Sequence, residues 1–519
     1  MNAHSGLFKE MKMNSSICSK CKKVVPAEHR VDSNKEYLDK KCPDCGVTSE
    51  LLSNDSAAYR KKRDFMSDRN YPGCGMNCLE CEHKQPNIIF IETTNRCNMN
   101  CPICITNVPS MGFEFEPRMD FFKRIFEHYS KYEFPPSVQL FGGEPTMRDD
   151  IFEVIRLARS YGLSVRLVTN GLKLSDKAYC DKMMASGASV LISFDGLRRE
   201  MYEKLRAFPG SLDLKYKALE NISQHKKGKV VLMTVIDKNF NGADMPQFLE
   251  YCQKNSGLLR GMFLMPLTHV WSEERLEYKP ERTTQEDVEK IVRDATDGKA
   301  EFVPLGSLEF KNLAKVFKVK HMPFLGVHPN CESFTLLVSN GKKYLSISSY
   351  LRYGFWGLVK DIRELDKKVG NYTDKAVSAF RKILIGIGLA GIFLKNVDFN
   401  AVFGAKGLKC FGKIMRFIFL FATGKPPKKI LKEDTEIKSI LQILLLPFED
   451  DCTVESERLE KCASCFAYID VKTDTVKSIP FCIWEKFKKV IMKDIAEVYN
   501  KEGYFKGLSQ NNGKTEEHV

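Results

Sequence analysis

The sequence has no long uninterrupted apolar stretch. Residues 1–20 contain no apolar run of signal-peptide length, and no segment of the chain offers eighteen consecutive uncharged apolar residues. Secreted and membrane-spanning proteins carry such stretches. We therefore expect a cytoplasmic protein without a spanning helix, and the hydrophobic content of 43% is sufficient for a folded core.

Two cysteine triplets of identical spacing each lack a nearby fourth cysteine. The triplets are Cys74, Cys78 and Cys81, and then Cys97, Cys101 and Cys104. Three thiolates can hold three irons of a four-iron cluster and leave the fourth iron open for a cofactor, whereas an electron-carrying cluster normally has four cysteines. The second triplet directly follows a strand-like run, 88–93, and the first does not. This difference predicts the catalytic cluster at the second triplet.

The remaining cysteines include two CxxC pairs in residues 1–55 of this eighteen-cysteine chain. In a reducing compartment, clustered spacings of this kind favour metal over disulfides. Two CxxC turns can close a tetrahedron of sulfur suited to zinc or to a single rubredoxin-like iron. The predicted ligands are Cys18, Cys21, Cys42 and Cys45. A structural zinc and an electron-delivering iron both fit this CxxC ribbon.

The positive charge is concentrated in one segment. The net formal charge is +14, and residues 351–430 contribute +11 through sixteen Lys/Arg against five Asp/Glu. Basic residues there are interleaved with apolar ones, which predicts basic amphipathic helices that can contact an anionic membrane surface. The apolar run 383–394 is too short to span a bilayer. A hairpin buried in the core is the alternative, and we expect no nucleic acid partner.

Residues 87–300 alternate between strand-like and helical patterns. Strand-like runs occupy 88–93, 138–141, 164–169, 190–194, 229–235 and 262–266. Helical periodicity occurs in 121–128, 151–161, 175–185, 215–225 and 245–253. The alternation predicts an α/β fold with a parallel sheet, and six strands predict a partial (βα)6 barrel. In such folds the reactive groups gather at the carboxyl ends of the strands.

Motifs follow the ends of the first two predicted strands. Residues 92–104 read ETTNRCNMNCPIC, and residues 142–146 read GGEPT. This pair resembles the signature of the radical S-adenosylmethionine (radical SAM) superfamily. The resemblance implies that Cys97, Cys101 and Cys104 bind a 4Fe-4S cluster whose open iron is chelated by S-adenosylmethionine. The predicted cofactor-binding residues are Gly142, Gly143, Glu144, Thr169, Asn170, Ser193 and Asp195, the last four of which also fit ordinary turn chemistry.

The other cysteines predict auxiliary clusters. The loop in residues 56–86 supplies Cys74, Cys78 and Cys81, and the element in residues 301–350 supplies Cys331 as a fourth ligand. Residues 431–505 form a cysteine-rich region, and residues 506–519 a disordered tail. The predicted ligands of a second auxiliary cluster are Cys452, Cys462, Cys465 and Cys482. The alternative is that some of these late cysteines are buried thiols.

The order of the motifs along the chain indicates a resemblance to one group within this superfamily. The CxxC ribbon, the GCxxxCxxC loop, the catalytic triplet, HPNC at 328–331 and IPFC at 479–482 together resemble archaeal tetraether lipid synthase and its bacterial relatives, a group also described as pterin methyltransferases. This resemblance implies carbon–carbon bond formation at an unactivated carbon of a lipid chain, or another modification there, with a reducing donor such as ferredoxin or flavodoxin. The alternative is peptide maturation or C-methylation of a small pterin-like heterocycle. A basic zinc-ribbon protein that binds nucleic acid is a remote alternative.

Overall fold

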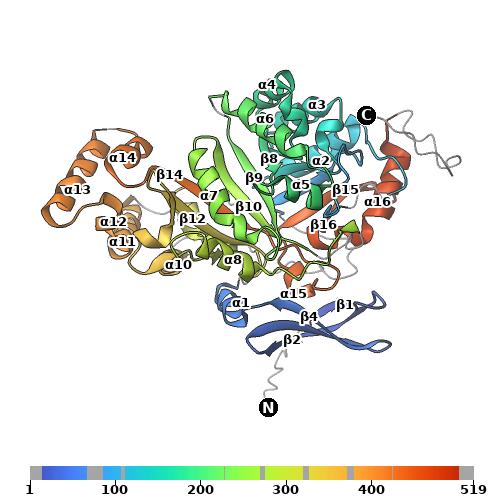
Figure 1. The fold of residues 1–519 in the computed structure, drawn as a ribbon, viewed down its shortest axis with the longest axis horizontal. Helices are drawn as coiled ribbons and strands as arrows, with labels where there is room; N and C mark the ends of the chain where they lie inside the picture. Colours follow the sequence, from blue (N-terminus) through green and yellow to red (C-terminus); the bar gives the residue numbers. More distant parts are fainter. Residues whose placement is uncertain are drawn as a thin grey trace, which may run out of the picture.

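The computed structural model describes residues 14–66, 86–106, 111–226, 228–268, 275–318, 327–370, 379–423 and 425–501. The predicted ligands Cys74, Cys78 and Cys81 and the predicted tail lie outside the described residues. Figure 1 shows a central sheet covered by helices, a small ribbon beside it at the N-terminal end, and a helical lobe at one end of the molecule.

Six parallel strands form the centre of the sheet and follow one another in chain order. They are β5 (Ile88–Glu92), β6 (Ser137–Phe141), β7 (Val165–Thr169), β8 (Ser189–Ser193), β9 (Val230–Ile236) and β10 (Leu259–Pro266). Their apolar side chains are largely buried, because helices cover a parallel sheet of this kind. The predicted α/β fold with a six-stranded partial barrel is confirmed.

Helices connect the six strands. They are α2 (Met119–Ser130), α3 (Ile151–Ser160), α4 (Lys177–Ser186), α5 (Arg199–Arg206), α6 (Ser211–Ser223), α7 (Met245–Lys254) and, after β10, α8 (Gln285–Asp294). Sequence reasoning missed α5. This helix buries Met201, Tyr202 and Leu205 along one side of an otherwise polar segment, a pattern too short for its periodicity to be recognised.

Strands from the part of the chain after residue 300 extend both edges of the barrel sheet. They are β11 (Val303–Pro304), β12 (Ser333–Ser339), β13 (Tyr344–Ser346), β14 (Ser439–Leu445), β15 (Ser464–Asp470) and β16 (Thr475–Pro480). Strand β14 pairs parallel with β10, and β15 pairs parallel with β5. Helix α16 (Trp484–Tyr499) then packs against β15. The cysteine-rich region is therefore part of the barrel sheet and not a separate appendage.

The N-terminal ribbon is an antiparallel four-stranded sheet followed by a helix. Its elements are β1 (Ser15–Ile17), β2 (Val24–Asp32), β3 (Lys35–Cys42), β4 (Gly46–Ser53) and α1 (Ser56–Lys62). Buried lysines attach it to the rest of the protein. Lys40 Nζ donates to the Cys452 carbonyl at 2.6 Å, and Lys62 Nζ lies 2.7 Å from a Glu286 carboxylate oxygen of α8.

The helical lobe is inserted between β13 and β14. After α9 (Lys311–Val316), its helices are α10 (Gly354–Gly370), α11 (Ala379–Asn396), α12 (Phe399–Phe403), α13 (Gly407–Ala422) and α14 (Pro427–Asp434). The lobe projects from the end of the molecule opposite α16 (Figure 1). Among the described residues, no helix has the length and apolarity needed to cross a membrane.

Candidate active site and metal centres

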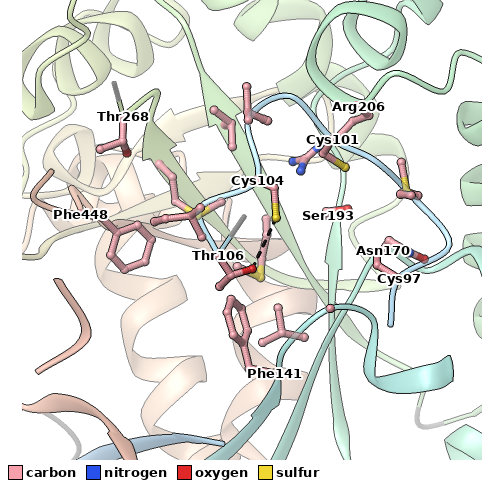
Figure 2. A pocket seen from close by; sticks show the side chains of 18 of the residues that line it. Cys97, Cys101, Cys104, Thr106, Phe141, Asn170, Ser193, Arg206, Thr268 and Phe448 are labelled. Carbon is pink, nitrogen blue, oxygen red and sulfur yellow. Dashed lines mark hydrogen bonds between the residues drawn. The ribbon is translucent and has the colours of Figure 1, made fainter. Parts of the chain in front are cut away.

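A cavity of about 220 Å³ opens at the carboxyl ends of the barrel strands. All three cysteines of the second triplet line it, and Figure 2 shows them on the loop that follows β5. Burial raises the pKa of the Cys101 thiol above its usual range, although the Arg206 guanidinium beside it opposes this shift. A thiol of this kind is deprotonated when a metal supplies positive charge. The donor set therefore fits a cluster held by three thiolates.

The glycine pair holds the cysteine loop against the second strand. Gly143 N–H donates to the Thr94 carbonyl at 2.7 Å, and Glu144 N–H donates to the Arg96 carbonyl at 2.8 Å. A Cβ at Gly142 would lie 2.5 Å from Thr94 O, and one at Gly143 would lie 2.2 Å from Arg96 O. Only glycine allows this approach of two backbones. In this structure the close approach is to the segment immediately before Cys97.

Glu144 is the buried anchor between the ends of β6 and β7. Its carboxylate accepts from the Thr146 hydroxyl at 2.7 Å, from the Thr169 hydroxyl at 2.7 Å and from Asn170 N–H at 2.6 Å. The side chain is 1% exposed. The sequence predicts Glu144 as a cofactor-binding residue, and in this structure its contacts order the turns that follow β6 and β7.

A buried lysine fixes the ends of β7 and β8. Lys215 Nζ, on α6, donates to the Asn170 carbonyl at 2.5 Å, to the Ser193 carbonyl at 2.6 Å and to the Ser193 hydroxyl at 3.0 Å. Asn170 and Ser193 both line the cavity. Burial, with Arg206 nearby, lowers the pKa of Lys215 to about 8. Sequence reasoning missed this residue, although a lysine on the core side of a predicted helix was the available signal.

Asp195 supports the cavity wall from behind. Its buried carboxylate accepts from Arg206 Nε at 2.7 Å and from Nη2 at 2.8 Å. Arg206 itself lines the cavity, and Figure 2 shows it beside Cys101. Although burial opposes it, the Asp195 carboxylate raises the pKa of Arg206 above its usual range. The missed helix α5 thus ends in a fixed cation at the site.

The rest of the cavity wall is mostly apolar. Residues far apart in the sequence contribute to it, including Leu446, Phe448 and Phe481 from the last third of the chain. The apolar lining consists of Phe90, Met99, Ile103, Ile105, Phe141, Val168, Met233, Val235, Phe263, Met265, Leu276, Leu446, Phe448 and Phe481, with the nearby prolines Pro102, Pro266 and Pro280. Such a lining suits an uncharged reacting group and excludes water from it.

The four ribbon cysteines converge on one point. The Sγ atoms of Cys18, Cys21, Cys42 and Cys45 all lie within 4.8 Å of one another. The Cys21 N–H lowers the pKa of the Cys18 thiol to about 6, although burial opposes this shift. Four convergent sulfur ligands fit a single tetrahedral ion.

The late cysteines occupy several places. Cys452 lies at the ribbon, where its carbonyl accepts from Lys40, and Cys465 is fully buried in β15. Arg458 Nε donates to Cys331 Sγ at 3.4 Å, and Arg458 also lowers the pKa of Cys482, which burial and Glu449 raise. The charge of the Cys462 thiolate also raises the pKa of Cys482. Cys331 and Cys482 therefore share the environment of Arg458, and the two auxiliary ligand sets remain predictions.

Comparison with known proteins shows the family to which the chain belongs. A model of the radical SAM superfamily matches residues 91–252, and a model of the HMPTM N-terminal zinc ribbon domain matches residues 11–54. The chain is 31% identical over 377 residues to 7,8-dihydro-6-hydroxymethylpterin dimethyltransferase of Methanocaldococcus jannaschii, a match that covers 69% of this chain and 74% of that protein. The chain belongs to the radical SAM superfamily. Membership implies S-adenosylmethionine and 4Fe-4S clusters as cofactors, and the barrel is joined to an N-terminal zinc ribbon domain.

Other relatives match shorter parts of the chain. Fe-coproporphyrin III synthase of Methanosarcina barkeri is 32% identical over 172 residues, which are 33% of this chain and 42% of that protein. A solved structure, SuiB of Streptococcus suis bound to S-adenosylmethionine, has 17% identity and a TM-score of 0.33 and covers 41% of this chain and 48% of that chain. The comparisons support radical SAM chemistry and do not support the narrower expectation of a tetraether lipid synthase.

Proposed function

We propose that this radical SAM enzyme modifies an unactivated carbon of a small heterocycle related to a pterin, by C-methylation. The observation that carries the proposal is the 377-residue similarity to a pterin dimethyltransferase. That match is more than twice as long as the barrel segment 91–252 that the superfamily model matches. It therefore includes parts of the chain outside the common barrel, where enzymes of one fold differ in substrate.

The residues of the cavity have separable roles in this proposal. Cys97, Cys101 and Cys104, which line the cavity, would hold the cluster. When bound, the cluster and S-adenosylmethionine supply a 5′-deoxyadenosyl radical that removes hydrogen from a substrate carbon. C-methylation also requires a one-carbon donor for the methyl group, such as a second S-adenosylmethionine, and a reductant that balances the electrons. Arg206 provides a fixed cation for an anionic part of the cofactor, and Asp195 orients that guanidinium.

The support around the site limits movement during the reaction. Glu144 and Lys215 bind the backbone at the ends of β7 and β8 through short hydrogen bonds. Reacting groups need placement to a fraction of an ångström, because small displacements cost much of the rate. The two residues are positioning residues, since their polar atoms contact protein groups.

The ribbon and the electron supply complete the proposal. The match to a zinc ribbon model favours zinc over a rubredoxin-like iron at Cys18, Cys21, Cys42 and Cys45. A structural zinc would hold together a module too small to have a large core of its own. Electrons for the catalytic cluster would then come from a separate reductant such as ferredoxin or flavodoxin.

A lipid chain is the second candidate substrate. The observation in its favour is the apolar lining of the cavity, to which Phe448 and Phe481 add aromatic surface. A long aliphatic chain is bound by such a surface with few directional contacts. In this case the radical would attack an unactivated carbon of the chain, and two attacks would allow two chains to be joined. An apolar wall also suits a planar heterocycle, so the lining alone does not separate the two substrates.

One comparison in cells tests both substrates. The full chain and its Cys101→Ala variant are expressed anaerobically, and pterins and hydrolysed lipids are compared by mass spectrometry. Pterins that gain whole methyl groups with the wild type alone support the proposal. Fused or mass-shifted lipid chains with unchanged pterins assign the second candidate. If both pools stay unchanged while the purified enzyme releases 5′-deoxyadenosine, both substrates are rejected.

A further inference from the structure

The outward faces of α11 and α13 are unusually apolar. Of the twenty large hydrophobic side chains that are exposed among the described residues, eleven lie on these two helices. They are Phe380, Ile383, Leu384, Ile387, Phe393, Leu394, Leu408, Phe411, Met415, Ile418 and Phe419, which together we call the lobe face. Exposed apolar groups gathered in this way mark a site of interaction.

The lobe does not need this face for its own folding. The opposite side of α11 packs through Ile385 and Leu389 into a small core with Val369 of α10. The opposite side of α13 packs through Ile414 and Phe417 against Phe403, whose ring lies 5.9 Å from that of Phe417. Both helices are thus apolar on two sides, and one side is already used. The alternative of a buried core hairpin does not describe this segment, because the lobe face is exposed.

The surrounding charge indicates what covers the lobe face. Residues 379–430 contain ten Lys/Arg and one acidic residue, Asp398. Arg381 and Lys382 are exposed near the start of α11, and Lys406 and Lys409 are exposed at the start of α13. Lysine is depleted in the cores of protein–protein interfaces, whereas helices that lie on membranes combine apolar groups with lysine and arginine. Exposed phenylalanine and isoleucine gain nothing from nucleic acid phosphates.

We propose that the lobe face binds the surface of an anionic lipid bilayer. The apolar side chains would enter the boundary between headgroups and acyl chains, while Lys406, Lys409 and their basic neighbours remain at the level of the lipid phosphates. The helices would lie along the surface, since neither is long and apolar enough to cross it. This assignment is independent of the substrate, because none of the lobe-face residues lines the cavity at the ends of the barrel strands.

Vesicle flotation of the full chain under anaerobic conditions tests the proposal. One set of vesicles contains phosphatidylcholine, and the other contains equal parts of phosphatidylcholine and phosphatidylglycerol. The protein should float with the anionic vesicles and be released by high salt. The Lys406→Gln, Lys409→Gln double variant should bind about 30-fold more weakly, given about 1 kcal/mol per basic residue near the surface. The matched control is Lys123→Gln with Lys182→Gln, two exposed lysines of α2 and α4, which should bind as the wild type does.

An apolar variant separates membrane binding from self-association. The double variant Phe411→Ser, Ile418→Ser should bind the anionic vesicles at least about 100-fold more weakly, because two large apolar side chains are no longer transferred from water into the bilayer. Both side chains are exposed, so the thermal unfolding of this variant should match that of the wild type. Failure of the wild type to float with either vesicle overturns the proposal. Equal binding to both kinds of vesicle also overturns it. A dimer that is seen in sedimentation and is abolished in the apolar variant overturns it too, because a second copy of the chain would then cover the lobe face.

Discussion

Replacement of Gly143 by alanine tests how the cysteine loop is held. The new Cβ would lie 2.2 Å from Arg96 O, whereas real contacts of this type begin at 3.0 Å, so the loop must move by about 0.8 Å. The movement would weaken the bonds from Gly143 N–H to Thr94 O and from Glu144 N–H to Arg96 O. At about 1 kcal/mol per hydrogen bond and about 1–3 kcal/mol for overpacking, we expect a loss of roughly 3–5 kcal/mol in local stability. A displacement near 1 Å at a reacting centre also costs about 100-fold in rate.

The assay measures cluster iron and 5′-deoxyadenosine release in anaerobically reconstituted protein. Gly143→Ala should release 5′-deoxyadenosine at least about 100-fold more slowly than the wild type. Gly257→Ala is the matched control, because a Cβ there meets nothing within 4 Å and the backbone is not left-handed. That control should retain the wild-type rate. Wild-type iron content and wild-type rate in Gly143→Ala would refute the assigned role of the glycine pair.

Three further predictions concern buried charges and the ribbon metal. Burial raises the pKa of the Glu92 carboxyl from 4.5 to about 7. The folded protein therefore favours the protonated carboxyl, and the contribution of Glu92 to the free energy of unfolding is fully present below pH 4.5 and is lost as the pH rises through 7. Glutamine does not ionise, so the stability of Glu92→Gln relative to the wild type should increase by about 3 kcal/mol between pH 4.5 and pH 8, measured by urea unfolding. A stability difference that does not change with pH would contradict the buried environment of Glu92. Lys40→Met leaves three oxygen acceptors without their donor, which should lower the free energy of unfolding by about 3 kcal/mol or more. The ribbon of this variant should be cleaved faster by a protease, whereas the control Lys41→Met, at an exposed neighbouring position, should behave as the wild type does. Elemental analysis should show that Cys42→Ser loses one zinc per chain and keeps its cluster iron. A variant that loses iron and keeps its zinc content would instead assign a rubredoxin-like iron to the ribbon.

The barrel and the set of residues around its cavity could be predicted from the sequence, because they follow from local patterns. Strands alternate with amphipathic helices, and the motifs stand directly after β5, β6 and β7. The position of a residue at a strand end is enough to place it in the cavity, as for Gly143 and Asn170. Asp195 marks the limit of this reasoning. It follows β8 as predicted, but its carboxylate turns to Arg206 behind the wall.

The parts that sequence reasoning missed depend on contacts between distant segments. Arg206 ends a short polar helix, and Lys215 is recognised as functional only once α6 is seen beneath the ends of β7 and β8. Phe448 reaches the cavity from more than three hundred residues beyond Cys97. Parallel pairing leaves no local signal of which strand lies beside which, so the places of β14 and β15 could not be read from their own residues.

The pairing of β15 with β5 also sets an order of events during synthesis. In this register Ser464 lies opposite Ile88, so 376 residues separate the two partners along the chain. At about 5–20 residues per second, the ribosome needs roughly 20 to 75 s to make that interval. Until then the outer edge of β5 has no permanent partner, and an apolar strand edge of this kind is prone to pair with another chain. We therefore expect the yield of this enzyme to rise with the supply of chaperones that shield the edge of β5 until β15 has been made.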